Sequence, residues 1–164
     1  MTTNAAPAPN NVRAVAPVVD ETDRAILRVL ARDGRIANNA LAERVGIAPS
    51  TCLGRVRALR ESGVIRGFYA DIAPDAIGHP IQAVVAVRLQ ADARGAISQF
   101  AAHVATLPQV LNVFFLAGAD DFLIHLAAAS TQDLRDFVVN LSRGSEVAST
   151  ETNLIFEHIR GTAL

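Results

Sequence analysis

The chain has no lysine, one cysteine and no apolar run long enough to cross a membrane. A single cysteine, Cys52, excludes an intramolecular disulfide and a cysteine-based metal cluster, so we expect it to be a small apolar packing residue. Neither a transmembrane run nor a signal-peptide pattern is present, which predicts a cytoplasmic protein without a membrane partner.

Catalytic signatures are also lacking. The four histidines are scattered without metal-ligand spacing, and no nucleophile triad or glycine-rich phosphate loop is present. His125 lies among apolar strand residues, where a hydrogen-bonded interior or interface role is expected. The sequence therefore predicts a protein that is not an enzyme and has neither a cofactor nor a metal site.

The charges that are present are unevenly distributed. Residues 20–71 hold nine Arg against seven acidic residues, whereas residues 81–164 hold five Arg against eight. The front half is therefore cationic and the back half anionic. All fifteen basic residues are Arg, which suits bidentate contacts to phosphate or guanine but also follows from a GC-rich coding bias.

Residues 1–19 are rich in Ala, Pro, Asn and Thr without periodicity, which predicts a disordered arm. Asp20 then begins a first helix, with Asp23 three residues later imitating a capping box. Asn38 is expected to cap a second helix, Gly46 to end it in a left-handed conformation, and Pro49 to open a third.

The third helix has an apolar side and a cationic side. Arg55, Arg57 and Arg60 project mostly away from the apolar side, and Gly63 followed by an expected strand over residues 64–72 completes a winged helix-turn-helix. The usual partner of that unit is double-stranded DNA, although a helix with three arginines can also be a plain solvated surface. The expected core of the unit is apolar: Ile26, Leu27, Leu30, Ile36, Leu41, Val45, Leu53, Val56, Leu59 and Ile65.

Residues 73–80 contain two prolines and a glycine, and we expect a hinge there between a domain of residues 20–72 and one of residues 81–160. The second domain reads as β-α-β-β-α-β, a ferredoxin-like sandwich, so the fold class is α+β. Its expected elements are strand 81–90, helix 94–107, strand 110–117, strand 122–129, helix 131–143 and strand 147–158. Both faces of the expected sheet carry apolar residues, and two helices can cover only one of them. The uncovered face therefore indicates a dimer packed sheet against sheet.

The chain resembles the Lrp/AsnC, or feast/famine, family of transcription regulators over residues of about 19 to 160. The motifs that carry the resemblance occur in order along the chain: DETDRAIL from Asp20, DGR from Asp33, LAERVG from Leu41, GVI from Gly63, LPQV from Leu107 and GADDF from Gly118. The resemblance implies a DNA-binding, nucleoid-associated regulator whose second domain binds an amino-acid effector and assembles homodimers, often into octamers.

The sequence suggests residues for two sites, one that contacts DNA and one that binds the effector. The expected DNA contacts lie on or just after the third helix: Ser50, Thr51, Arg55, Arg57, Arg60 and Arg66. The expected effector contacts lie at the turn that matches the family's effector site and on the last strand: Leu116, Gly118, Ala119, Asp120, Asp121, Thr150 and Thr152. At the turn, a backbone without Cβ at Gly118 could approach a carboxylate, and Asp120 or Asp121 could pair with an ammonium group.

Two departures from the family pattern concern the third helix. Ala48 stands where a capping Ser is common, and Gly54 stands where Arg is frequent, which removes a possible phosphate contact. Two other interpretations remain open: an ordinary Gly-Ala-Asp-Asp turn without a ligand, and an architectural DNA-binding protein that needs no effector.

Overall fold

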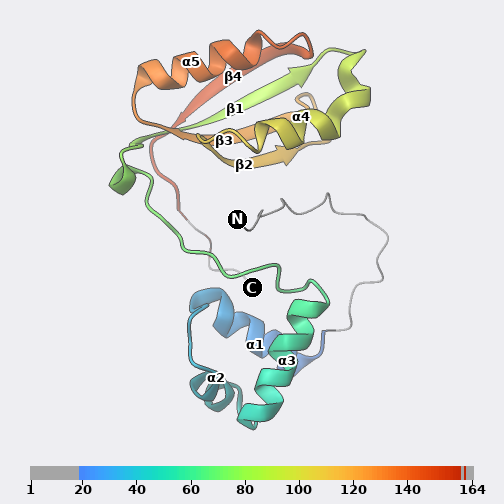
Figure 1. Ribbon diagram of the computed structural model, residues 1–164, viewed down its shortest axis with the longest axis vertical. Helices are drawn as coiled ribbons and strands as arrows, with labels where there is room; N and C mark the ends of the chain where they lie inside the picture. Colours follow the sequence, from blue (N-terminus) through green and yellow to red (C-terminus); the bar gives the residue numbers. More distant parts are fainter. Residues whose placement is uncertain (1–18, 160, 162–164) are drawn as a thin grey trace, which may run out of the picture. The chain divides into compact units, whose positions relative to one another are not determined.

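The computed structural model describes residues 19–159 and 161, and the described chain divides into two compact units between Asp71 and Ile72 (Figure 1). The disordered arm expected over residues 1–19 lies, save for residue 19, outside the described residues.

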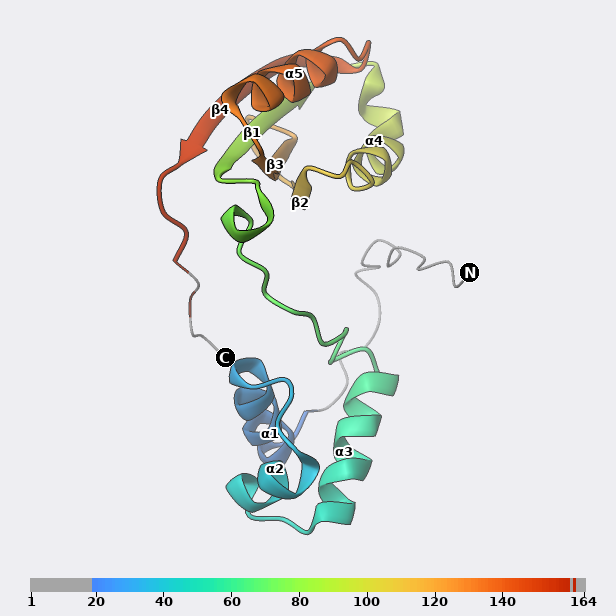
Figure 2. The same ribbon diagram turned by 60° about the vertical axis from the view of Figure 1, so that its left-hand side comes forward.

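The first unit is built from three helices, α1 (Glu21–Arg32), α2 (Asn38–Val45) and α3 (Pro49–Glu61) (Figure 2). One residue or more from each helix is buried in its core, and Cys52 of α3 is fully buried there, as expected. Burial raises the pKa of the Cys52 thiol, because the thiolate would lose its hydration. The buried core consists of Ile26, Leu41, Ala42, Cys52 and Leu59.

The helix ends follow the sequence signals in part. Asp20 caps α1 in a capping box with Asp23, as expected, and Gly46 ends α2 in the left-handed region at φ 75°. Asn38, however, is the first residue of α2 and not its cap; its side-chain amide instead donates to the carbonyl of Pro49, 2.9 Å away. The expected Asn38 cap is therefore wrong, since this side chain bonds across the turn to the start of α3.

The strand expected over residues 64–72 is also wrong, because these residues form no strand in the described chain. A strand requires a neighbouring backbone for its N–H and C=O groups, and none pairs with this segment among the described residues. Three of its large apolar side chains are exposed instead: Phe68, Tyr69 and Ile72.

The second unit has the expected β-α-β-β-α-β order. After a short 3₁₀ helix, η1 (Asp75–Ile77), come β1 (Ile81–Leu89), α4 (Ile97–Val104), β2 (Val110–Phe115), β3 (Phe122–Ala128), α5 (Thr131–Ser142) and β4 (Val147–Ile155). The four strands are antiparallel in the order β2-β3-β1-β4, which confirms the ferredoxin-like fold.

The helix expected over residues 94–107 is shorter in the structure. Residues Ala93–Ala96 form a 3₁₀ turn, η2, and α4 itself ends at Val104. The chain tightens at that end, where Thr106 and Leu107 bond back three residues to His103 and Val104. Pro108 is consistent with an end at this point, because in a continued helix its ring would clash with the carbonyl of Val104, four residues earlier.

The two faces of the sheet differ in their cover. Alternate β1 residues Ala83, Val85 and Val87 pack under α4 and α5, with Phe122, Ile124 and Leu126 of β3 beside them. No helix among the described residues covers the opposite face, which carries both apolar and polar side chains. On this open face Phe114 of β2 is 52% exposed, so apolar surface is available to a partner there.

Candidate DNA interface and effector turn

The turn between α2 and α3 sets the direction of α3. Gly46 adopts the left-handed conformation, and the amide of Ile47 donates to the carbonyl of Ala42 at 3.0 Å, which closes the end of α2. Pro49 then occupies the first turn of α3, where its missing N–H costs no hydrogen bond. Cys52 and Leu59 anchor the inner side of α3 in the core, so its other side faces outward.

The outward side of α3 carries most of the expected DNA contacts. Ser50, Thr51, Arg57 and Arg60 are all exposed on it. Leu53 lies on the same side and is 61% exposed, so its expected place in the core is wrong. Helical spacing places Leu53 near Val56 but does not say how far around the helix the contact with α1 and α2 extends.

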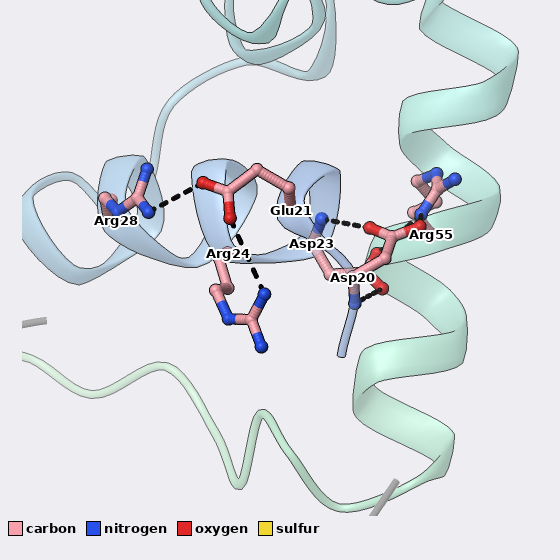
Figure 3. A network of polar contacts seen from close by, with 6 residues as sticks. All are labelled: Asp20, Glu21, Asp23, Arg24, Arg28 and Arg55. Atoms are coloured by element: carbon pink, nitrogen blue, oxygen red, sulfur yellow. Dashed lines mark hydrogen bonds and ion pairs between the residues drawn. The ribbon is translucent and has the colours of Figure 1, made fainter. Parts of the chain in front are cut away.

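Arg55 is held by the protein itself. Its guanidinium lies 2.7 Å from a carboxylate oxygen of Asp20 and 2.9 Å from one of Asp23, both at the start of α1 (Figure 3). The backbone amide of Asp23 and then the Arg55 guanidinium hold the pKa of Asp20 below its ordinary value, and the two carboxylates raise the pKa of Arg55. Arg55 thus joins α3 to α1, and its charge is largely met within the unit.

The other arginines remain closer to solvent. Arg57 pairs with Glu61 one turn along α3 at 2.8 Å, an exposed pair that contributes little stability. Arg60 and Arg66 lie along a shallow groove between α3 and the segment that follows it. The residues that line this groove are both apolar and charged: Leu53, Val56, Arg57, Arg60, Glu61, Ile65, Arg66, Gly67 and Phe68.

The turn expected to bind the effector joins β2 to β3 and is tied to the end of β1. The amide of Leu116 donates to the carbonyl of Asp121, and the amide of Asp121 donates to the carbonyl of Val87, both at 2.9 Å. Arg88 donates from Nε to the carbonyl of Ala119 at 2.9 Å. The turn is therefore held in place at the edge of a rigid sheet.

The two adjacent acids of this turn have different surroundings. A carboxylate oxygen of Asp121 accepts a hydrogen bond from the amide of Leu89 at 2.8 Å, which fastens the end of β1. Asp120 is more loosely held, with its carboxylate 3.7 Å from the Arg88 guanidinium. A Cβ at Gly118 would meet no other atom within 4 Å, so the backbone there is open to a ligand.

The two threonines expected at the same site do not lie beside this turn within one chain. Thr150 and Thr152 of β4 are opposite Val87 and Val85, on the side of β1 away from β3. Two strand spacings, about 10 Å, therefore separate the Thr150 backbone from that of β3. The Thr150 hydroxyl instead lies 3.1 Å from that of Ser142 on α5.

Sequence reasoning missed the roles of two polar residues of β1, Arg88 and Gln82. Arg88 is the one charged residue in an otherwise apolar stretch of that strand, and this isolation was the available signal that it serves the turn. On the open face, the His125 ring bonds through Nε2 to Gln82 at 3.1 Å and through Nδ1 to Asn112 at 3.2 Å. This contact bears out the expectation that His125 is hydrogen-bonded.

Among the described residues, no group of three or more His, Cys, Asp or Glu side chains is arranged to hold a metal ion. No helix in the described part of the chain is both long and apolar enough to cross a bilayer.

The helix-turn-helix and the four-stranded domain agree with the protein families and relatives that the chain matches. Residues 19–66 match the winged helix-turn-helix DNA-binding family, and residues 82–163 match the Lrp/AsnC ligand binding domain. The HTH-type transcriptional regulator AldR of Mycolicibacterium smegmatis is 59% identical over 156 residues, which cover 94% of this chain and 90% of the relative. The leucine-responsive regulatory protein of Rhizobium meliloti is 38% identical over 143 residues, covering 87% and 92%.

The fold is shared with solved structures as well. The crystal structure of a transcriptional regulator from Neisseria meningitidis in complex with L-methionine superposes with a TM-score of 0.80 at 32% identity, over 88% of this chain and 94% of that one. The relatives are transcriptional regulators and not enzymes, which confirms the expectation that this chain is not an enzyme. The chain belongs to the Lrp/AsnC family and is a DNA-binding transcriptional regulator.

Proposed function

We propose that this regulator binds a two-fold symmetric site in double-stranded DNA through the outward side of α3, and that a free amino acid bound at the turn of residues 116–121 changes that binding. The observation that carries the proposal is the combination of a cationic outward helix side with an open, firmly anchored turn in the second unit. The structural neighbour from Neisseria meningitidis, which holds L-methionine, supports the ligand class.

In this proposal Ser50, Thr51 and Arg57 face base edges, and Arg60 and Arg66 bind phosphates. A recognition helix contacts bases mainly through its N-terminal half, which matches the positions of Ser50 and Thr51, whereas Arg57 lies further along α3 on the same outward side. Arg55 is the exception among the residues expected from the sequence. Its contacts with Asp20 and Asp23 give it a positioning role, since it fastens α3 to α1.

At the turn, Asp120 binds the ammonium group of the amino acid. Its ion pair with Arg88 is long, so an ammonium group can displace it at small cost, and Arg88 is then available to the ligand carboxylate. The open backbone at Gly118 lets the ligand approach closely, with Leu116 and Ala119 beside it. Thr150 and Thr152 would belong to the same site only if a second copy of the chain brings them there.

Two further parts of the proposal concern assembly and location. The apolar side chains on the open face of the sheet support a homodimer that packs sheet against sheet, and dimers assembling further, up to an octamer, would place ligand sites between them. A regulator of this kind acts in the cytoplasm, on the nucleoid. The effector would act by favouring one assembly, and its influence is limited by its difference in affinity between assemblies.

A thermal-shift screen against the twenty amino acids tests the effector site. A ligand present at a hundred times its Kd and bound only to the folded protein adds about 2.7 kcal/mol of apparent stability. We expect a selective shift with one class of amino acid, and we expect Asp120→Asn to abolish it while Asp92→Asn, an exposed control on the same unit, keeps it. DNA binding without ligand should be unchanged in both variants.

The alternative function is that of an architectural DNA-binding protein that responds to no ligand. It would be favoured if no amino acid shifts the melting temperature while DNA binding is retained. A shift that survives in Asp120→Asn would instead place the ligand elsewhere on the chain.

A further inference from the structure

Leu53 differs from the other large apolar residues of α3. Val56 and Leu59 are partly or fully buried against the core, whereas Leu53 is 61% exposed. Ser50 lies three residues before it and Arg57 four residues after it, so the three side chains share one side of the helix. The side that carries the expected base contacts therefore presents a large apolar group at its centre.

Gly54 is the second unexplained residue of this surface. Glycine inside a helix costs about 1 kcal/mol relative to alanine. A Cβ at Gly54 would meet no other atom within 4 Å, and the residue has no positive φ, so neither packing nor backbone conformation within the first unit requires glycine. Its effect is to leave the helix backbone uncovered directly beside Leu53.

The charges around Leu53 indicate what kind of surface it meets. The groove that Leu53 lines also contains Arg57, Arg60 and Arg66, against one acidic residue, Glu61. An anionic partner that also presents apolar groups fits this combination of arginines and an exposed leucine. The major groove of DNA has that chemistry, since phosphates flank it and each thymine presents a C5-methyl group.

We infer that Leu53 contacts thymine methyl groups in the major groove, and that Gly54 lets α3 approach the bases closely enough for this contact. The inference rests on the proposed DNA-binding function and adds a specificity determinant to it. Because Leu53 is uncharged, its contribution is to discrimination between bases and not to the salt dependence that phosphate contacts produce.

The test uses DNA selected by the protein itself. Duplexes bound by the wild-type protein are recovered from a random pool, and the consensus duplex is synthesised with each thymine replaced in turn by deoxyuridine, which lacks only the methyl group. Wild-type binding should weaken about fourfold at one or two positions, the factor expected for one buried methyl-sized group. Leu53→Ala should bind the thymine duplex more weakly than the wild type does, by a similar factor. Its affinity should not change when deoxyuridine replaces thymine at those positions.

Two further variants make the result specific. Leu111→Ala, an exposed leucine of the second unit, should keep the thymine preference. Gly54→Ala should melt at a higher temperature yet bind the consensus duplex more weakly, a combination that a purely structural role cannot produce. The slope of log Kd against log salt should be the same in wild type and Leu53→Ala.

The inference is overturned if deoxyuridine weakens wild type and Leu53→Ala equally, or if Leu53→Ala changes the oligomeric state and not the base preference. Failure to recover any consensus from the pool is a different result. It would overturn the proposed sequence-specific function itself.

Discussion

At the scale of single residues, Asp120 and Asp121 show how neighbours of the same type acquire different roles. Asp121 accepts a hydrogen bond from the Leu89 amide and also places its own amide on the Val87 carbonyl, so it closes the end of β1. Asp120 contacts Arg88 at a longer distance and stays partly exposed. Of the two acids, we therefore propose Asp120 for the effector role that was expected of either one.

We predict that Asp121→Asn destabilises the second unit by about 1–2 kcal/mol, because a hydrogen bond to a charged acceptor is replaced by a weaker one. Urea unfolding followed by circular dichroism measures this loss. Asp120→Asn is the matched control and should change the free energy of unfolding by less than about 0.5 kcal/mol. Equal losses in the two variants would contradict the separation of roles.

At the scale of elements, His125 links three neighbouring strands through its bonds to Gln82 of β1 and Asn112 of β2. In the neutral form with its proton on Nε2, the ring donates to the Gln82 oxygen and accepts from the Asn112 amide. Burial, and secondarily the nearby His158 ring, lower the pKa of His125. Protonation would also place two donors, the ring and the Asn112 amide, against each other.

This arrangement predicts a pH dependence with a definite sign. Because the folded-state pKa of His125 is below the unfolded value of about 6.5, the unfolded chain binds more protons on acidification. The neutral His125 ring therefore stabilises the folded protein when the pH is above the unfolded-state pKa. This contribution is lost as the pH falls through the lowered folded-state pKa. Urea unfolding should give a lower free energy of unfolding at pH 5.5 than at pH 7.5. His125→Gln should reduce this difference, whereas His103→Gln, an exposed control, should leave it unchanged.

At the scale of the whole molecule, the open face of the sheet is the surface that we propose for assembly. Phe114 and Leu123 are opposite each other on β2 and β3, and Val84 and Ala86 of β1 continue the apolar surface. The helices of the described chain that pack on the sheet cover only its other face, so a second copy of the chain is the proposed cover.

We predict that Phe114→Asp yields monomers, because an unpaired carboxylate would be buried at the centre of the proposed interface. Sedimentation velocity measures the change. Leu154→Asp is the control, since Leu154 is comparably exposed but lies opposite Ala83 on the helix-covered face. A dimer that persists in Phe114→Asp and is lost in Leu154→Asp would place the interface on the other face.

Much of the fold was predictable because its signals are local. The capping box at Asp20, the left-handed Gly46 and the opening Pro49 act over a few residues, and each appears as expected. The strand and helix order of the second unit follows from periodicity in the same way. The missing strand at residues 64–72 is the informative failure, because a strand depends on a partner that local sequence does not supply.

By itself, the sequence determined the order of the elements, the helix-turn-helix, the cationic character of the first unit and the location of the turn at Gly118. These depend on short-range backbone preferences and on residue type. Only the tertiary structure decided the roles of particular side chains. Arg55 meets two acids more than thirty residues away, Asp121 bonds to Leu89, and Leu53 falls outside the core. Those outcomes depend on which distant segments come together, and helical or strand spacing carries no information about that.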